Sequence, residues 1–225
     1  MLSLQSNASV FQAAIAGSKT FSVTVDSPLQ GGDVYLFFMG QTDGGTNLVA
    51  KWDGDLISGL SGSVESHDTA ICGNGSKDAV FGYLKVPSGD YDVAKNLKFQ
   101  WDDGNFKSIS GYAVIEGVDT IASETAWTDP ATLVTMPYTE TPTLVPNEWL
   151  LATVFYPFEN GGVIAPTPNS LCNTWDDGMN SSNQMGYCER GDTLSFDCGD
   201  ATEYLGRISW IIKPFGPAGA SPIWY

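Results

Sequence analysis

Apolar and polar residues alternate over short stretches along most of the chain, and Gly, Asn, Asp and Pro interrupt them. Alternation with a period of two is typical of a strand with one buried face, and a sustained helical stripe at i, i+3, i+4 and i+7 is absent. The pattern predicts about ten to twelve strands joined by turns, with a single helical turn in each of two Ala-containing stretches. The clearest strand candidates are 21–25, 34–39, 80–86, 97–101, 106–115, 149–156, 193–198 and 206–212, and the Ala-containing stretches are 11–16 and 121–127.

Many short strands separated by turn signals predict an all-β fold, and we expect an antiparallel β-sandwich that resembles a jelly roll. Residues 119–148 are rich in Thr and Pro, and Greek-key topologies need a long crossing connection of this kind. We expect one sandwich domain over residues 1–213, and a split into two domains at the Thr/Pro-rich segment is the alternative. Residues 214–225 are predicted to be a Gly/Pro-rich docking tail that binds its own domain or a neighbouring subunit through an apolar tip. The tip residues are Ile223, Trp224 and Tyr225.

The chain carries 26 acidic and 10 basic side chains, a formal net charge of -16, and 12% of its residues are aromatic. The aromatic content indicates a globular protein, because acidic disordered chains are poor in aromatic residues. The charge excludes binding to nucleic acid and to anionic membranes, since both rely on Lys and Arg. The first residues lack the basic and apolar pattern of a signal peptide, and no stretch has the ~20 apolar residues of a membrane-spanning helix. We therefore expect synthesis as a soluble chain in the cytoplasm.

A Trp-Asp-Gly motif occurs three times, at 52–54, 101–104 and 175–178, and the last two contain a second Asp. Asp-Gly supplies the positive φ angles of a tight turn, so the motif predicts hairpins in which the Trp caps the core. Two alternatives are a calcium site made by converging Asp oxygens and a sugar site in which an aromatic face stacks on the ligand. The rings that a sugar site would use are Trp52, Trp101 and Trp175.

Few other residues are candidates for chemistry. The spacings of the four cysteines match no common zinc site, and we expect buried free thiols, with a Cys172–Cys188 disulfide or a metal site as the alternatives. His67 is the only histidine and is expected in a solvated loop. Glu116 and Glu203 lie on predicted strands and are expected to face solvent. We therefore predict no catalytic residue, no cofactor and no metal ion, and a protein that is not an enzyme.

The run from residue 21 to residue 120 has a recognisable order of strands and turns. Segment 34–39 is followed by the Trp-Asp-Gly turn at 52–54, by segment 80–91 with its Pro-Ser-Gly turn, and by segments 97–101 and 109–115. This rhythm of strand, Trp/Tyr-x-Gly turn, strand, Pro-x-Gly turn and strand resembles the β-sandwich modules of tailed-phage virion proteins. Such modules occur in head decoration proteins, head fibres and tail fibres. The resemblance assigns no role to any single residue.

The resemblance implies a structural virion protein on the outer surface of a phage particle, either a capsid decoration (cement) protein or a fibre subunit that stabilises the assembled shell. Its partners would be the major capsid protein or other virion proteins and further copies of the chain. Packaged DNA would repel a charge of -16, which favours the outside of the shell. The alternative is a carbohydrate-binding module for host-surface or extracellular glycan. A glycoside hydrolase, which needs two carboxylates in one cleft, is the third interpretation.

Overall fold

The computed structural model describes residues 1–44, 46–57, 65–67, 77–128, 133–156, 163–176 and 181–216. Within these ranges the chain forms sixteen strands and one short 3-10 helix (Ser88–Asp90). Every strand pair is antiparallel. The predicted all-β antiparallel fold is therefore confirmed. The described residues contain no helix that is long and apolar enough to cross a membrane.

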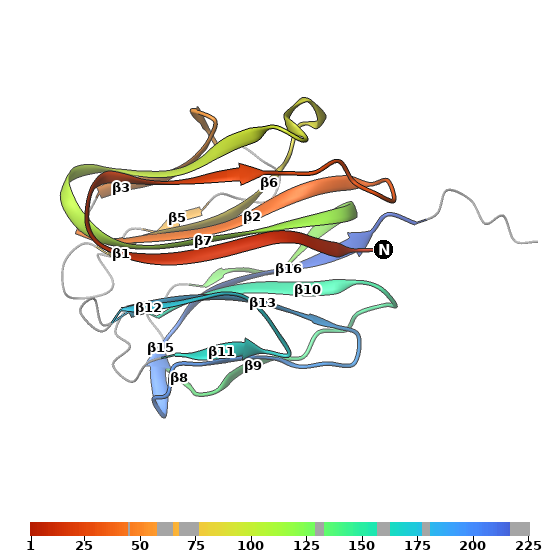
Figure 1. Cartoon of the computed structure of the whole chain (residues 1–225). Coiled ribbons are helices and arrows are strands. Elements are labelled where there is room, and N and C mark those ends of the chain that lie inside the picture. The colour runs from red at the N-terminus through yellow and green to blue at the C-terminus, as the bar shows by residue number, and fades with distance from the viewer. Residues whose placement is uncertain are drawn as a thin grey trace, which may run out of the picture.

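The strands are stacked in four layers, which lie one below another in Figure 1. The first layer contains residues 18–24 of β1 (Ser3–Thr24), β3 (Thr46–Trp52), β4 (Asp55–Leu56) and residues 94–101 of β7 (Ala94–Thr128). The second contains residues 3–16 of β1, β2 (Asp33–Asp43), β5 (Glu65–His67), β6 (Lys77–Lys85) and residues 105–116 of β7. The third contains residues 118–128 of β7, β10 (Trp149–Tyr156), β12 (Asn169–Asp176), β13 (Ser181–Glu189) and β16 (Gly206–Pro214).

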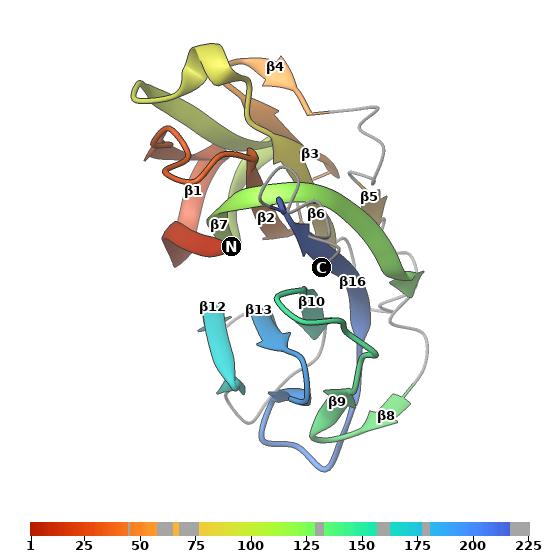
Figure 2. The same ribbon diagram turned by 90° about the vertical axis from the view of Figure 1, so that its right-hand side faces the viewer.

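The fourth layer is a 3-stranded sheet of β9 (Tyr138–Glu140), β11 (Ile164–Thr167) and β14 (Leu194–Asp197). A separate 2-stranded sheet pairs β8 (Leu133–Thr135) with β15 (Thr202–Tyr204). The other three layers belong to one 11-stranded hydrogen-bonded sheet, which is folded over on itself. Figure 2, turned by 90°, shows this folded sheet from its end.

The first three layers are joined by strands that bend from one layer into the next. β7 pairs with β1 in the first and second layers and with β16 in the third. Gly104 (φ 59°) and Gly117 (φ 74°) occupy the two bends of β7, with positive φ angles that other residues rarely adopt. The hairpin predicted at 101–104 is therefore wrong, because the strand bends there and continues in a second layer.

Two further expectations from the sequence need correction. The Thr/Pro-rich segment 119–148 is only in part a connection, because residues 119–128 continue β7 and the segment also contains β8 and β9. The helical turns predicted at 11–16 and 121–127 lie instead inside β1 and β7. Strand pairing there outweighs the weak helical preference of a few Ala residues. A single domain over residues 1–213 and a jelly-roll order of strands stay predictions.

Three hydrophobic cores fill the spaces between the four layers. β2 contributes to two of them, because Phe38 packs between the first and second layers and Phe37 packs between the second and third. β10 also contributes to two cores, because Leu151 packs between the second and third layers and Leu150 packs between the third and fourth. A strand that is buried on both faces has a continuous apolar sequence, which explains the apolar runs in β2 and β10.

Candidate functional site

The first Trp-Asp-Gly motif forms a hairpin between β3 and β4 in the first layer. Trp52 pairs with Asp55, and the two residues between them, Asp53 and Gly54, have φ angles of 48° and 100°. Two consecutive positive φ angles are typical of a type I′ turn. The predicted hairpin is confirmed for this motif, and it places the side chain of Trp52 beside the 3-10 helix and that of Asp53 beside Lys95.

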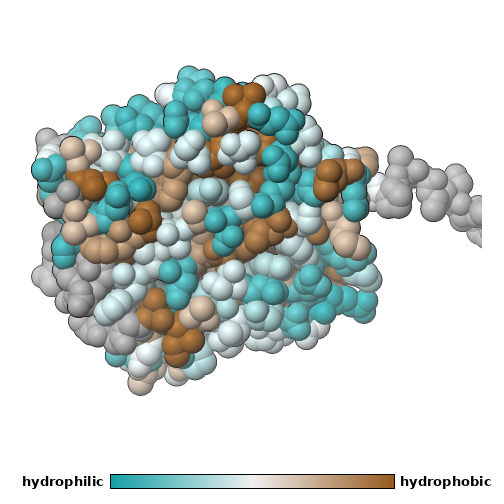
Figure 3. Space-filling model, in the orientation of Figure 1, coloured by the Kyte–Doolittle hydropathy of each residue, from teal (hydrophilic) through white to brown (hydrophobic). Residues whose placement is uncertain are grey.

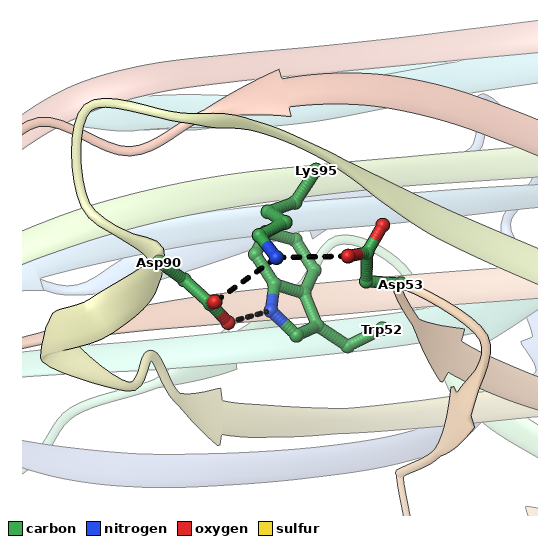
Figure 4. Close-up of polar contacts among 4 residues, drawn as sticks. All are labelled: Trp52, Asp53, Asp90 and Lys95. Atoms are coloured by element: carbon green, nitrogen blue, oxygen red, sulfur yellow. Dashed lines mark hydrogen bonds and ion pairs between the residues drawn. The ribbon is translucent and has the colours of Figure 1, made fainter.

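Four side chains around this hairpin form a polar network, shown in Figure 4. The indole Nε1–H of Trp52 donates a hydrogen bond to Asp90 Oδ2 at 2.8 Å. Lys95 Nζ lies 3.1 Å from Asp90 Oδ1 and 2.8 Å from Asp53 Oδ2, so its ammonium group bridges two carboxylates. Asp90 ends the 3-10 helix and Lys95 lies at the start of β7. Segments that are distant in the sequence therefore meet at Trp52.

The contacts in this network stabilise the charged forms of Asp90 and Lys95. The hydrogen bond from Trp52 lowers the pKa of Asp90 below its ordinary value, and the contact with Lys95 also lowers it, while burial opposes both. Hydrogen bonds to Asp53 and Asp90 raise the pKa of Lys95. Asp90 and Lys95 therefore stay ionised at neutral pH.

A hollow of about 300 Å³ opens beside the network. Trp52 is 6% exposed, so it contributes little open ring face to this hollow. The wall offers carboxylate acceptors, one cationic donor and apolar contacts within reach of one small polar ligand. The charged lining residues are Asp53, Asp55, Asp90 and Lys95, and the apolar ones besides Trp52 are Leu56, Ile57, Leu84 and Pro87.

The other two motifs lie at different places in the fold. Trp101 is buried at the first bend of β7, and it lines a second hollow of about 510 Å³ together with Lys98 and Gln100. Its indole Nε1–H is buried without a hydrogen-bond partner. Trp175 is 37% exposed near the end of β12, which pairs with β13 as a hairpin, although residues 177–180 of the turn lie outside the described ranges. Trp52 and Trp101 therefore line different hollows, and Trp175 lines neither.

Other predicted residues are only partly described. The apolar tip Ile223, Trp224 and Tyr225 lies outside the described residues, as does Cys72. His67 lies in β5, which pairs with β6, so its expected place in a loop is wrong.

Cys172, Cys188 and Cys198 are buried free thiols, as predicted, and the alternative disulfide between the first two is not formed. Burial raises the pKa of Cys172 to about 12 and that of Cys188 to about 11. Thiols with such pKa values stay protonated at neutral pH and are poor nucleophiles. Cys172 instead connects two layers, because its Sγ lies 3.3 Å from the carbonyl oxygen of Tyr112.

Glu116 and Glu203 are both buried, although we expected both to face solvent. Glu116 accepts hydrogen bonds from Ser3 Oγ (2.5 Å), Gln5 Nε2 (3.0 Å) and the backbone N–H of Leu29 (3.2 Å). Burial raises the pKa of Glu116, but these hydrogen bonds outweigh burial and hold that pKa below its ordinary value. The carboxylate thus fastens the beginning of β1 to the second bend of β7.

Cys198, Asp200 and Glu203 are the group that sequence reasoning missed. Each offers one ligand atom, and these atoms lie within 4.8 Å of one another. A thiolate and two carboxylates are ligands that Zn²⁺ accepts. The spacings of Cys and His residues do not reveal this group, because its other members are acidic residues two and five positions further along the chain.

Comparison with known proteins assigns the chain to no family. No protein-family model, no curated protein and no solved structure matches it.

Proposed function

We propose that the chain is a structural protein on the outer surface of a phage virion, a capsid decoration (cement) or fibre subunit that binds and stabilises the assembled shell. The observation that supports this best is the layered body, in which a hydrophobic core fills each space between layers. Because β1 joins the first two layers and β7 joins the first three, shearing one of these three layers past another would break strand pairing at the bends. Such a stiff, closely packed body suits a reinforcing subunit.

The position of the acidic side chains supports an exterior location. Carboxylates on the surface keep many copies soluble before assembly, whereas packaged DNA inside the shell would repel them. The exposed aspartates of the described residues include Asp26, Asp53, Asp55, Asp92, Asp102, Asp119 and Asp192.

A cement protein works by binding the assembled shell and not its separate subunits. Such binding stabilises the shell by mass action, because disassembly then also has to release the bound chain. The predicted contact with the shell is the apolar tip of the tail, Ile223, Trp224 and Tyr225.

Add-back to virus particles tests this function. Particles are purified from a phage that lacks this gene, and the full chain is added to them. We expect the chain to bind and to raise the temperature at which the particles release DNA. A chain truncated after residue 216, which keeps all of β16 and lacks the apolar tip, should bind more weakly. Absence of the chain from wild-type particles, or binding with no change in DNA release, would contradict a stabilising role.

Glycan binding is the second candidate, and the hollow beside Trp52 favours it. Carboxylates and an ammonium group can hydrogen-bond sugar hydroxyls, and the exposed Leu56 (52%) offers apolar contact beside them. A glycan array probed with the full chain tests this candidate, with Lys95→Gln as the site variant and Lys19→Gln as the matched control. A site at the hollow predicts roughly tenfold weaker binding for Lys95→Gln, about 1.4 kcal/mol, and no change for the control. Equal binding by both variants, or no binding by the wild type, would exclude it.

A further inference from the structure

The two longest stretches without a charged side chain are residues 1–18 and 160–175. They are unusual in a chain in which Asp, Glu, Lys and Arg make up 16% of the residues. The first stretch contains the second-layer part of β1, and the second contains β11 and nearly all of β12. The sequence thus leaves particular strands free of charge.

The fold brings these uncharged strands to one side of the molecule, which faces the viewer in Figure 1. β1 and β12 lie in neighbouring layers and contact each other directly. The Sγ of Cys172 lies 3.4 Å from the carbonyl oxygen of Ala8, and the side-chain amide of Asn7 donates a hydrogen bond to the carbonyl oxygen of Leu171. β11 packs beside β12. We call this surface, formed by residues 3–16 of β1, by β11 and by residues 169–175 of β12, the uncharged face.

Two sheet edges run along the uncharged face. Among the described strands, β1 forms ladder hydrogen bonds only with β7, and β12 only with β13. Between its register shifts, β1 has a regular run from Ser6 to Gln12, which spans roughly 23 Å at 3.3 Å per residue. Natural proteins protect such edges with charged side chains, above all Lys, because an open edge pairs with other strands. The β1 edge lacks that protection.

Apolar side chains are exposed on the same face. Leu4 is 38% exposed, Ile164 is 56% exposed and Trp175 is 37% exposed. Figure 3, which views the molecule from this side, shows separate apolar patches among pale and teal, more hydrophilic residues. A surface with open edges, scattered apolar groups and no charge is typical of a contact region.

We propose that the uncharged face is where two copies of this chain meet, with the Ser6–Gln12 edge of β1 paired antiparallel to the same edge of a second copy. Two chains of charge -16 repel each other, and the uncharged face lets them approach without opposing carboxylates. A two-fold contact requires a patch that is complementary to itself, and an uncharged strand edge meets this requirement. The contact is independent of any virion function, since it depends only on this surface.

A new charge on the β1 edge tests this contact. Ser9 is exposed in the middle of the regular run, and in a two-fold pairing Ser9→Glu would bring two carboxylates close together. Sedimentation equilibrium of the full chain should show a dimer, and Ser9→Glu should weaken dimerisation roughly tenfold or more. The matched control is Ser88→Glu, an equal change at an exposed residue of the 3-10 helix, and it should leave dimerisation unchanged. Thermal unfolding of dilute samples checks that all three proteins are folded.

Hydrogen exchange locates the contact without a mutation. Amides of residues 6–12 should become more protected as the protein concentration rises, whereas amides of the 3-10 helix should not. A chain that stays monomeric at all concentrations overturns the proposal, as does a dimer that both variants weaken equally. If the chain is monomeric but Ser9→Glu abolishes binding to phage particles, the face belongs to a contact with the shell and the second copy is excluded.

Discussion

Asp90 accepts two hydrogen-bond donors at once, the indole of Trp52 and the ammonium group of Lys95. The local part of this arrangement could be predicted, because Asp-Gly after Trp52 specifies the hairpin turn. The rest of the network could not be predicted, because no local pattern relates its members. Asp90 lies 38 residues after Trp52, and Lys95 lies 42 residues after Asp53. Long-range contacts of this kind depend on which strands become neighbours.

Replacing Asp90 by Asn should produce a pH-dependent loss of stability. The pKa of Asp90 is lowered in the folded chain, so its carboxylate stabilises the fold above its ordinary pKa of about 4, and this contribution is lost as the pH falls through the folded value. We expect Asp90→Asn to lower the free energy of unfolding by about 1–2 kcal/mol at neutral pH. Urea unfolding at neutral pH and in acid measures the difference from the wild type.

That difference should shrink in acid, where the wild-type carboxylate becomes protonated. Asp119→Asn, at an exposed aspartate of β7, is the control and should show little change at either pH. A difference that is equally large at both pH values would contradict the charged role of Asp90.

β2 and β7 show what alternation predicts about an element and what it misses. The apolar run at 34–39 correctly predicted a strand, and its burial on both faces marks a central layer. At Gly104 the same turn chemistry that makes a hairpin at Gly54 instead bends a strand into a second layer. A hairpin and a bend can both use the positive φ angle of a glycine. The bend forms at Gly104 because β7 pairs with β1 on either side of it.

Gly40 of β2 tests how closely the first two layers pack. A Cβ atom at Gly40 would lie 2.7 Å from Cε1 of the fully buried Phe99, which belongs to the facing layer. Gly40→Ala should therefore lower the free energy of unfolding by about 2 kcal/mol, the usual effect of overpacking a core. Gly89→Ala is the matched control, because a Cβ atom there meets nothing within 4 Å. Equal stability of both variants in urea would contradict the close packing of these layers.

Strands shared between layers hold the first three layers of the molecule together, and the fourth layer packs on the third through a hydrophobic core. β7 contributes to three layers, and β16 joins β7 to β10 in the third. The sequence predicted a sandwich but not four layers, because the number of layers depends on where strands bend and which strands they then join. The net charge of -16 follows from the composition alone. The uncharged face could not be predicted from the sequence, because it forms only when the fold brings residues 1–18 and 160–175 together.

The shared strands predict that the chain unfolds as one cooperative unit. Separating the third layer from the second would pull apart β7, which runs through both layers, and would expose the core between them. Differential scanning calorimetry should therefore show one transition with equal calorimetric and van't Hoff enthalpies. Two separate transitions would instead support two domains divided near the Thr/Pro-rich segment.

Electron cryomicroscopy of the native phage particle tests the proposed function most directly. We predict density for the four-layer body on the outside of the particle, in contact with the shell or forming a fibre. Density inside the shell, or particles that contain no copy of the chain, would contradict a structural role on the virion surface.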